Sequence, residues 1–338
     1  MKVFKQIFAT IIVSFNFSAL ASENLVTPEN YARAETDEAW RKIFEEVGSN
    51  TFRHDRGLVP IDKQPAVTMN RDTVYSLGIF HAPTGTTITL PNPTDGRYQS
   101  AMIMQNDDYT DQVFYAPGTF KIESETQFVL AIIRTQINPS NPSDAKNVKI
   151  LQDKIRIDYP DGITPKKYTI VNWDQNSLEF FREKFQKEAA KLPNLNETSG
   201  ARGVIKPDML NLGASVALGL LPPQHAVYIY RDYGLKGDLC YVATYEQPPF
   251  KNGGFFSFTM YGSDKYLKDL NSNLNNRNII FNDDGSFKIY YGPKEKCGNA
   301  ANWLPTPGDN WYLGMRIYRP GSLVIKGKYN IPIPSIVP

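Results

Sequence analysis

The sequence predicts a mainly β fold with α segments, arranged as two β-sandwich-like domains joined by a helical region. Short runs rich in β-branched and aromatic residues recur along the chain between turn signals. Two segments with helical periodicity interrupt these runs near the middle of the chain. A length of 338 residues suits two domains, each with a core of its own.

The first 21 residues have the pattern of a secretory signal peptide. Lys2 and Lys5 precede an apolar stretch that opens at Ile7, and Ala19-Leu20-Ala21 gives the small-x-small pattern of a cleavage site. The stretch is shorter than the ~20 residues needed to cross a bilayer, so a membrane anchor is the less favoured alternative. We therefore expect cleavage after Ala21, a periplasmic or secreted location, and no membrane span.

Residues 22–200 are predicted to form the first domain. A helix is expected over residues 28–47, because Trp40, Ile43, Phe44 and Val47 repeat at helical spacing before a glycine. Its aromatic stripe is interpreted as core. Alternation and β-branched content then predict strands at residues 86–90, 98–105, 128–134 and 155–159.

The helical region separates the two domains, with the boundary near residue 200. Leu178, Phe181, Phe185, Ala189 and Leu192 share one helical face, and residues 207–221 are apolar almost all round, which is typical of a buried helix. Residues 201–338 are predicted to hold this buried helix and a second β-sandwich-like domain. Its strands are expected at residues 239–245, 255–261, 287–291 and 312–318.

The densest polar constellation lies at the entry to a predicted strand, between Thr68 and Tyr75. His54 is the candidate general base, Asp72 could orient it, and Tyr75 could donate a hydrogen bond to a developing charge. Asn70 and Arg71 are candidates for holding a polar or anionic ligand group. The alternative is structural, with Asn70 and Asp72 capping a turn and His54 satisfied within the fold.

A second cluster lies near the C-terminus. Arg316 and Tyr318 share a strand face with Tyr312, and Trp303 and Trp311 precede them. An arginine flanked by aromatic rings can bind a carboxylate or the edge of a sugar ring. The alternative interpretation is an interdomain ion pair packed among aromatic core residues.

Both clusters carry a family resemblance. The pattern Asn70-x-Asp72-Thr73-x-Tyr75, preceded by His54, resembles the signature of DUF1254. The run Ala301-Asn302-Trp303-Leu304-Pro305-x-Pro307, followed by Trp311-Tyr312-Leu313 and Arg316-x-Tyr318, resembles the companion DUF1214. The two resemblances cover most of the chain after about residue 28. They imply two β-sandwich-type domains joined by helical segments, and no agreed activity.

Several classes of site are not indicated. With 37 basic and 35 acidic residues and no dense basic stripe, nucleic acid is not expected as a partner. Only three histidines are present, so a histidine-rich metal centre cannot be built, and no phosphate or dinucleotide motif occurs. The acidic run around Asp107, Asp108 and Asp111 is interpreted as a solvated loop rather than a calcium site. We expect neither a metal nor a cofactor.

The two cysteines, Cys240 and Cys297, suit an oxidising compartment. They either form a disulfide or are one buried thiol and one unrelated loop thiol, and the sequence leaves these alternatives open.

Three functions remain for an exported protein of this kind. The favoured one is a binding protein for a small organic or amphiphilic molecule, held in a polar and aromatic cleft. The first alternative is a hydrolase or lyase that uses His54 and Asp72 as an acid–base pair. The second is a structural or host-interaction protein of the envelope. Whether the chain is an enzyme, and whether it is a homo-oligomer, stay open.

Overall fold

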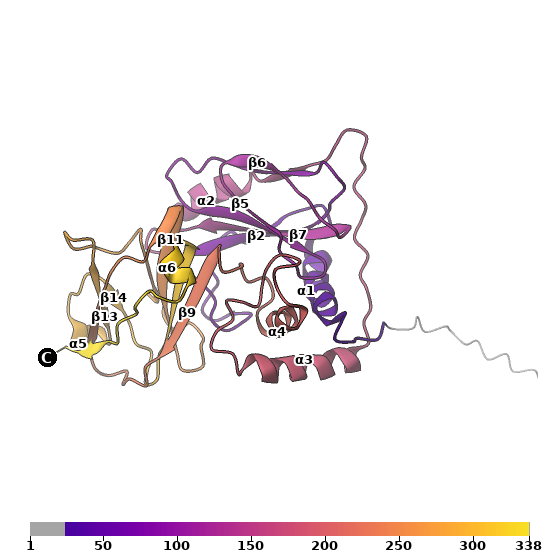
Figure 1. The fold of residues 1–338 in the computed structure, drawn as a ribbon. Coiled ribbons are helices and arrows are strands. Elements are labelled where there is room, and N and C mark those ends of the chain that lie inside the picture. The colour runs from indigo at the N-terminus through magenta and orange to yellow at the C-terminus, as the bar shows by residue number, and fades with distance from the viewer. Residues whose placement is uncertain (1–23, 338) are drawn as a thin grey trace, which may run out of the picture.

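The computed structural model of the protein describes residues 24–337. The predicted signal peptide and its cleavage site lie outside the described residues. Within them the chain forms sixteen strands in four sheets and six helices (Figure 1). The predicted mainly β, multi-domain fold is thus confirmed. No helix in the described part of the chain combines the length and the apolar character needed to cross a membrane.

The first sandwich pairs a five-stranded sheet with a three-stranded one. Ile88 and Leu90 of the small sheet pack against Ile103, Val129 and Ile133 of the large sheet. All neighbouring strands within these two sheets are antiparallel. The five-stranded sheet has the order β1 (Arg53–His54), β2 (Thr73–His81), β7 (Phe128–Gln136), β4 (Gln99–Gln105) and β5 (Gln112–Tyr115), and the small sheet the order β6 (Gly118–Lys121), β3 (Thr87–Leu90) and β8 (Arg156–Asp158).

Helices cover part of the other face of the five-stranded sheet. Helix α1 (Tyr31–Val47) places Trp40 and Ile43 against this sheet. It begins three residues later than predicted, because the Asn30 side chain accepts a hydrogen bond from the Thr27 amide (2.8 Å) and closes a separate turn.

Two further helices, α3 (Gln175–Ala189) and α4 (Pro207–Ala217), pack on α1 and on each other. The predicted inward face of α3 is confirmed at Leu178, Phe185 and Ala189. Helix α4 ends earlier than predicted, since Leu218 is extended and Gly219 has a φ of 80°. Helix α2 (Asp144–Gln152) was not predicted.

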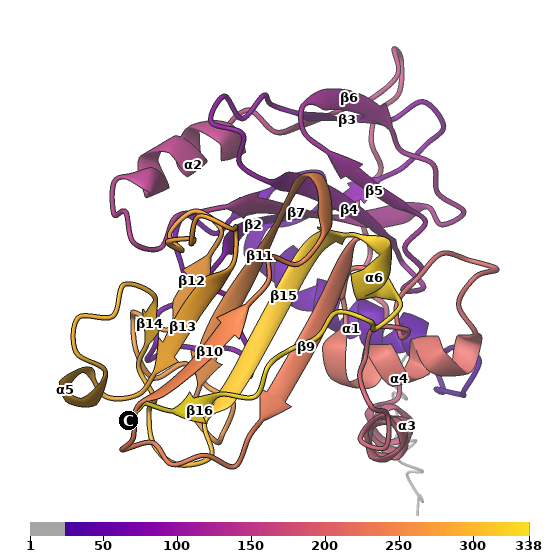
Figure 2. The same cartoon turned by 60° about the vertical axis from the view of Figure 1, so that its left-hand side comes forward.

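The second sandwich (Figure 2) contains two four-stranded sheets. The core between them is rich in aromatic side chains. Phe256, Phe258 and Met315 from one sheet pack against Tyr245 and Phe287 from the other. The first sheet has the order β12 (Asn273–Asn275), β11 (Phe250–Tyr261), β15 (Tyr312–Pro320) and β9 (Ala226–Asp232), and the second the order β14 (Trp303–Leu304), β13 (Phe287–Tyr291), β10 (Tyr241–Tyr245) and β16 (Ser335–Ile336).

Two short helices complete this half of the chain, α5 (Lys294–Cys297) and α6 (Ser322–Ile325). A disulfide bond joins Cys240, just before β10, to Cys297 at the end of α5. It therefore ties the β13–β14 connection to the second sheet.

Candidate functional site

Strand β15 alternates between two different environments. Leu313, Met315 and Ile317 enter the apolar core of the second sandwich. The residues between them point to the opposite face, where β15 pairs Arg316 with Tyr228 of β9 and Ser257 of β11. In a two-sheet sandwich such an outer face is normally solvated. Here β9, β11 and β15 lie beside the ends of β2 and β4 (Figures 1 and 2), so the first sandwich covers it.

Polar groups from both sandwiches meet at this junction, which we call the polar layer. Its first-sandwich members precede or lie on β2 and β7, and its second-sandwich members lie on β9, β11 and β15. The polar layer consists of Asn70, Asp72, Tyr75, Arg134, Tyr228, Ser257, Arg316 and Tyr318.

Asp72 joins the two halves of the polar layer. Its side chain is fully buried and accepts hydrogen bonds from Ser257 Oγ (2.6 Å) and Asn273 Nδ2 (2.8 Å), both in the second sandwich. Burial raises the pKa of Asp72, and the positive charge of Arg316 opposes the rise. The turn before β2 is capped by Asn70, whose Oδ1 accepts from the amides of Asp72 and Thr73. Asp72 is therefore a bridging carboxyl rather than a turn cap.

Arg316 is 2% exposed and reaches back across the same junction. Its guanidinium donates to the Thr259 hydroxyl (3.1 Å), the Tyr261 hydroxyl (2.7 Å) and the Thr68 carbonyl (2.5 Å). Thr68 has a φ of 52°, an uncommon conformation for a β-branched residue. Arg316 thus fixes the segment that leads into β2.

Arg134 is the site residue that sequence reasoning missed. Only 5% exposed, it lies between Tyr75 of β2 and Ser100 of β4, with its guanidinium 5.5 Å from the centre of the Tyr75 ring. It donates to the Gly219 carbonyl (2.8 Å) and contacts Met102 Sδ (3.7 Å). The signal was present in the sequence, since an arginine closes an otherwise apolar run predicted to be a central strand.

Tyrosines supply the remaining surface of the polar layer. Tyr75 and Tyr228 are half-buried, and Tyr75 Oη is hydrogen-bonded by Asn70 Nδ2 (2.7 Å). Burial raises the pKa of Tyr228 to about 12, although Arg134 acts against it. Tyr318 is buried and stacks on Phe255 with ring centres 4.4 Å apart. At neutral pH the Tyr228 phenol is therefore protonated and can donate a hydrogen bond.

The proposed acid–base pair is not assembled. His54 lies opposite Ser76 in the β1–β2 pairing, and its Nδ1 is 2.7 Å from Ser76 Oγ. Asp72 precedes Ser76 by four residues, a separation of roughly 13 Å along an extended chain. Burial lowers the pKa of His54, so it is a neutral partner of Ser76 at physiological pH. The pairing register of β1 and β2 thus gives His54 and Asp72 separate hydrogen-bond partners.

The other predicted residues divide between the polar layer and more distant positions. Asn70, Tyr75, Arg316 and Tyr318 lie together in the layer. Tyr312 is at its margin, half-buried and stacked on Tyr230 with ring centres 5.6 Å apart.

Two predicted ligand residues lie elsewhere. Arg71 is buried and donates to the Val59 carbonyl (3.3 Å). Trp303 belongs to the other sheet of the second sandwich and donates to the Gly292 carbonyl (2.8 Å). Among the described residues, neither side chain makes a hydrogen bond or ion pair with a side chain of the polar layer, although Asp72 is an electrostatic neighbour of Arg71.

Two surface depressions lie away from these residues. One, of about 520 Å³, is lined by β3 and the segment 153–156, and the other, of about 350 Å³, by residues 262–264, Lys268 and 307–309. Among the described residues no group of histidine, cysteine and acidic side chains could hold a metal ion. In the acidic loop, Asp107 pairs with Arg202 (2.6 Å).

Gly314 lets two tyrosine rings lie across β15 at the edge of the polar layer. A Cβ at this position would lie 2.9 Å from Tyr230 Cε1 and 3.1 Å from Tyr261 Cε2. We expect Gly314→Ala to lower the free energy of unfolding by about 1–3 kcal/mol in urea titrations. Gly57→Ala is the control, since nothing lies within 4 Å of its Cβ position. Equal stability of the two variants would show that the rings are free to move.

Comparison with known proteins supports part of the predicted resemblance. Residues 231–322 match the family described as "Protein of unknown function (DUF1214)". This segment contains the Trp303, Trp311 and Arg316 motifs, so the second-half resemblance is confirmed there. No curated protein sequence matches the chain.

Two crystal structures share the fold. The VPA0106 protein from Vibrio parahaemolyticus superposes with a TM-score of 0.68 at 19% identity, over 92% of this chain and 100% of that chain. A putative uncharacterized protein from Burkholderia cenocepacia has a TM-score of 0.51 at 12% identity, over 91% of this chain and 87% of that chain. At these identities the likeness extends to the fold alone.

Proposed function

We propose that the protein binds a small organic molecule in the polar layer between the two sandwiches. The observation that carries this proposal is that side chains far apart in sequence meet there. Ser257 donates to Asp72, Arg316 donates to the Thr68 carbonyl, and Tyr75 and Tyr318 belong to one hydrophobic cluster. Sites at domain junctions that combine aromatic rings with a few convergent polar groups are the usual setting for small ligands. Tyr75 and Tyr228 keep part of their surface accessible there.

The hydrolase or lyase alternative is not carried forward, because His54 and Asp72 have separate partners. We also propose, on the pattern Asn70-x-Asp72-Thr73-x-Tyr75, that the first half is related to DUF1254. Export to the periplasm or medium is proposed with it. The Cys240–Cys297 disulfide supports an oxidising compartment.

Native mass spectrometry of the chain purified from its own compartment tests the binding proposal. We expect an adduct of small-molecule mass that is released on denaturation. Tyr228→Trp, which adds bulk at the half-buried edge of the polar layer, should abolish the adduct. Tyr290→Trp, at a half-buried position on β13 of the other sheet, is the matched control and should retain it. An adduct that survives in Tyr228→Trp, or a wild-type chain without any adduct and without a binding response to organic compounds, would contradict the proposal.

A further inference from the structure

Arg134 is a buried cation that the protein does not neutralise. The groups with the strongest electrostatic effect on it are four tyrosines, Tyr75, Tyr98, Tyr228 and Tyr318. Its hydrogen-bond partners are a carbonyl and a thioether, and the guanidinium also lies over the Tyr75 ring. Most of its five N–H donors therefore have no hydrogen-bond acceptor among the described residues. A charge removed from water without a partner is costly and is rarely retained in an interior.

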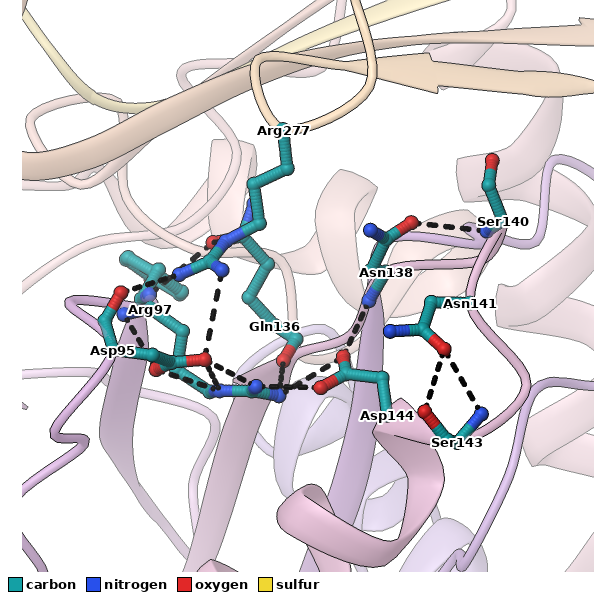
Figure 3. Close-up of polar contacts among 10 residues, drawn as sticks. Asp95, Arg97, Gln136, Asn138, Ser140, Asn141, Ser143, Asp144 and Arg277 are labelled. Carbon is teal, nitrogen blue, oxygen red and sulfur yellow. Dashed lines mark hydrogen bonds and ion pairs between the residues drawn. The ribbon is translucent and has the colours of Figure 1, made fainter.

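A second buried arginine of the same sandwich shows the usual solution. Arg97 is 4% exposed and is bound by the carboxylates of Asp95 and Asp144 and by the Gln136 carbonyl (Figure 3). The two arginines have similar burial but opposite surroundings. Arg71 and Arg316 are also buried without an ion pair to any described residue, but each has Asp72 among its strongest electrostatic neighbours. Arg134 differs from these arginines because no carboxylate is among its strongest electrostatic neighbours.

The polar layer as a whole carries excess positive charge. Arg134 and Arg316 bring two cations, and Asp72 is the carboxyl among the strongest electrostatic neighbours of Arg316. Ser257 and Asn273 already occupy both oxygens of Asp72. With all three groups ionised, one positive charge remains, and it lies on the Arg134 side. One monovalent anion would complete the layer.

We infer that the ligand is an organic monocarboxylate whose carboxylate binds Arg134 and whose apolar body lies among the tyrosine rings of the polar layer. A planar carboxylate matches the planar guanidinium and accepts two parallel hydrogen bonds from it. Tyr75 and Tyr228 flank this position with half-buried rings, and Leu218 and Leu221 add aliphatic surface beside it. The inference rests on the proposed function, because it names the ligand class of the same site.

Isothermal titration of the full chain with matched acid–amide pairs tests this inference. Benzoate, 2-naphthoate and decanoate are each compared with their primary amides, which have almost the same shape without the charge. We expect at least one acid to bind at least tenfold more tightly than its amide. Arg134→Gln should reduce the affinity for that acid at least tenfold and reduce the affinity for the amide by a smaller factor. Arg231→Gln, at an exposed position on β9, should change neither.

The outcomes separate the two proposals. Amides that bind as tightly as their acids would overturn the carboxylate assignment and leave the binding function standing. Absence of binding by every compound, together with a chain free of adduct, would overturn both. Because the acid–amide comparison on the unaltered chain is independent of any substitution, failure of Arg134→Gln to fold would not remove the test.

Discussion

Asp144→Ala is expected to lower the free energy of unfolding by about 3–5 kcal/mol, the range for removing one partner of a buried ion pair. Asp144 is the first residue of α2, and its carboxylate binds Arg97 Nη2 (2.6 Å) and Nη1 (3.1 Å). It also accepts from the Asn138 amide (2.7 Å). The substitution leaves the Arg97 guanidinium buried with only the partly exposed Asp95 carboxylate to neutralise it.

The pH dependence of this effect has a defined sign. Burial works against ionisation of Asp144, but hydrogen bonds from Arg97 and the Asn138 amide prevail and lower its pKa. The contribution of Asp144 is therefore complete above the pKa of an unfolded aspartate and is lost as pH falls through the lower folded value. Urea titrations at neutral pH measure the loss. Asp158→Ala, whose partner Arg156 is exposed, should cost at most about 1 kcal/mol. A loss below 1 kcal/mol in Asp144→Ala would contradict the prediction.

The same network also connects the two sandwiches. Arg277, which follows β12, donates to the Asp95 carbonyl (3.1 Å) and to Gln136 Oε1 (3.1 Å), as Figure 3 shows. Loss of Asp144 therefore affects the anchor of α2 and also the ion-pair cluster on which Arg277 rests.

Arg316→Met is expected to cost a similar ~3–5 kcal/mol, because it removes the cation with the largest electrostatic effect on the buried Asp72 carboxyl. It also removes the donor to the Tyr261 hydroxyl and to the Thr68 carbonyl. In Arg316→Met the pKa of Asp72 in the folded state should rise further. The folded variant then keeps the Asp72 proton at pH values where the unfolded chain has released it. The deficit in unfolding free energy relative to wild type should then grow as pH rises through the folded pKa of wild-type Asp72, which lies above the usual aspartate value.

A double-mutant cycle isolates this interaction. Asp72→Asn removes the charge that Arg316 stabilises, so the double variant should be less destabilised than the sum of the single variants by at least about 1 kcal/mol. Arg231→Met, at an exposed position on β9, is the control and should lie within about 0.5 kcal/mol of wild type. Additive single effects with no pH dependence would show that Arg316 and Asp72 act independently.

Local patterns predicted much of the fold. The run beginning at Phe128 was predicted as a strand, and the structure starts β7 at that residue. The alternation of Tyr312, Arg316 and Tyr318 identified one face of β15. These features depend on residues close in sequence, because the order of apolar and polar residues indicates which face of an element is buried.

Features that depend on contacts between residues distant in sequence were harder to predict. Nothing in the run around His54 indicates that β1 pairs with β2 opposite Ser76, away from Asp72. Helix α2 follows a stretch rich in Asn, Pro and Ser, and its anchor is the distant Arg97. Arg134 was missed for a related reason. The absence of an acid beside its guanidinium becomes evident only when all its neighbours are known.

The polar outer face of β15 also bears on how the chain assembles. Each half has a hydrophobic cluster within its own two sheets. A further cluster joins Tyr98 and Met102 of the first half to Phe255 and Tyr318 of the second, so docking buries some hydrocarbon together with the groups around Arg316. Docking then exchanges water for hydrogen bonds such as Ser257 to Asp72, an exchange with a small net gain per bond. We therefore expect the seam between the halves to open at a lower free energy than either interior.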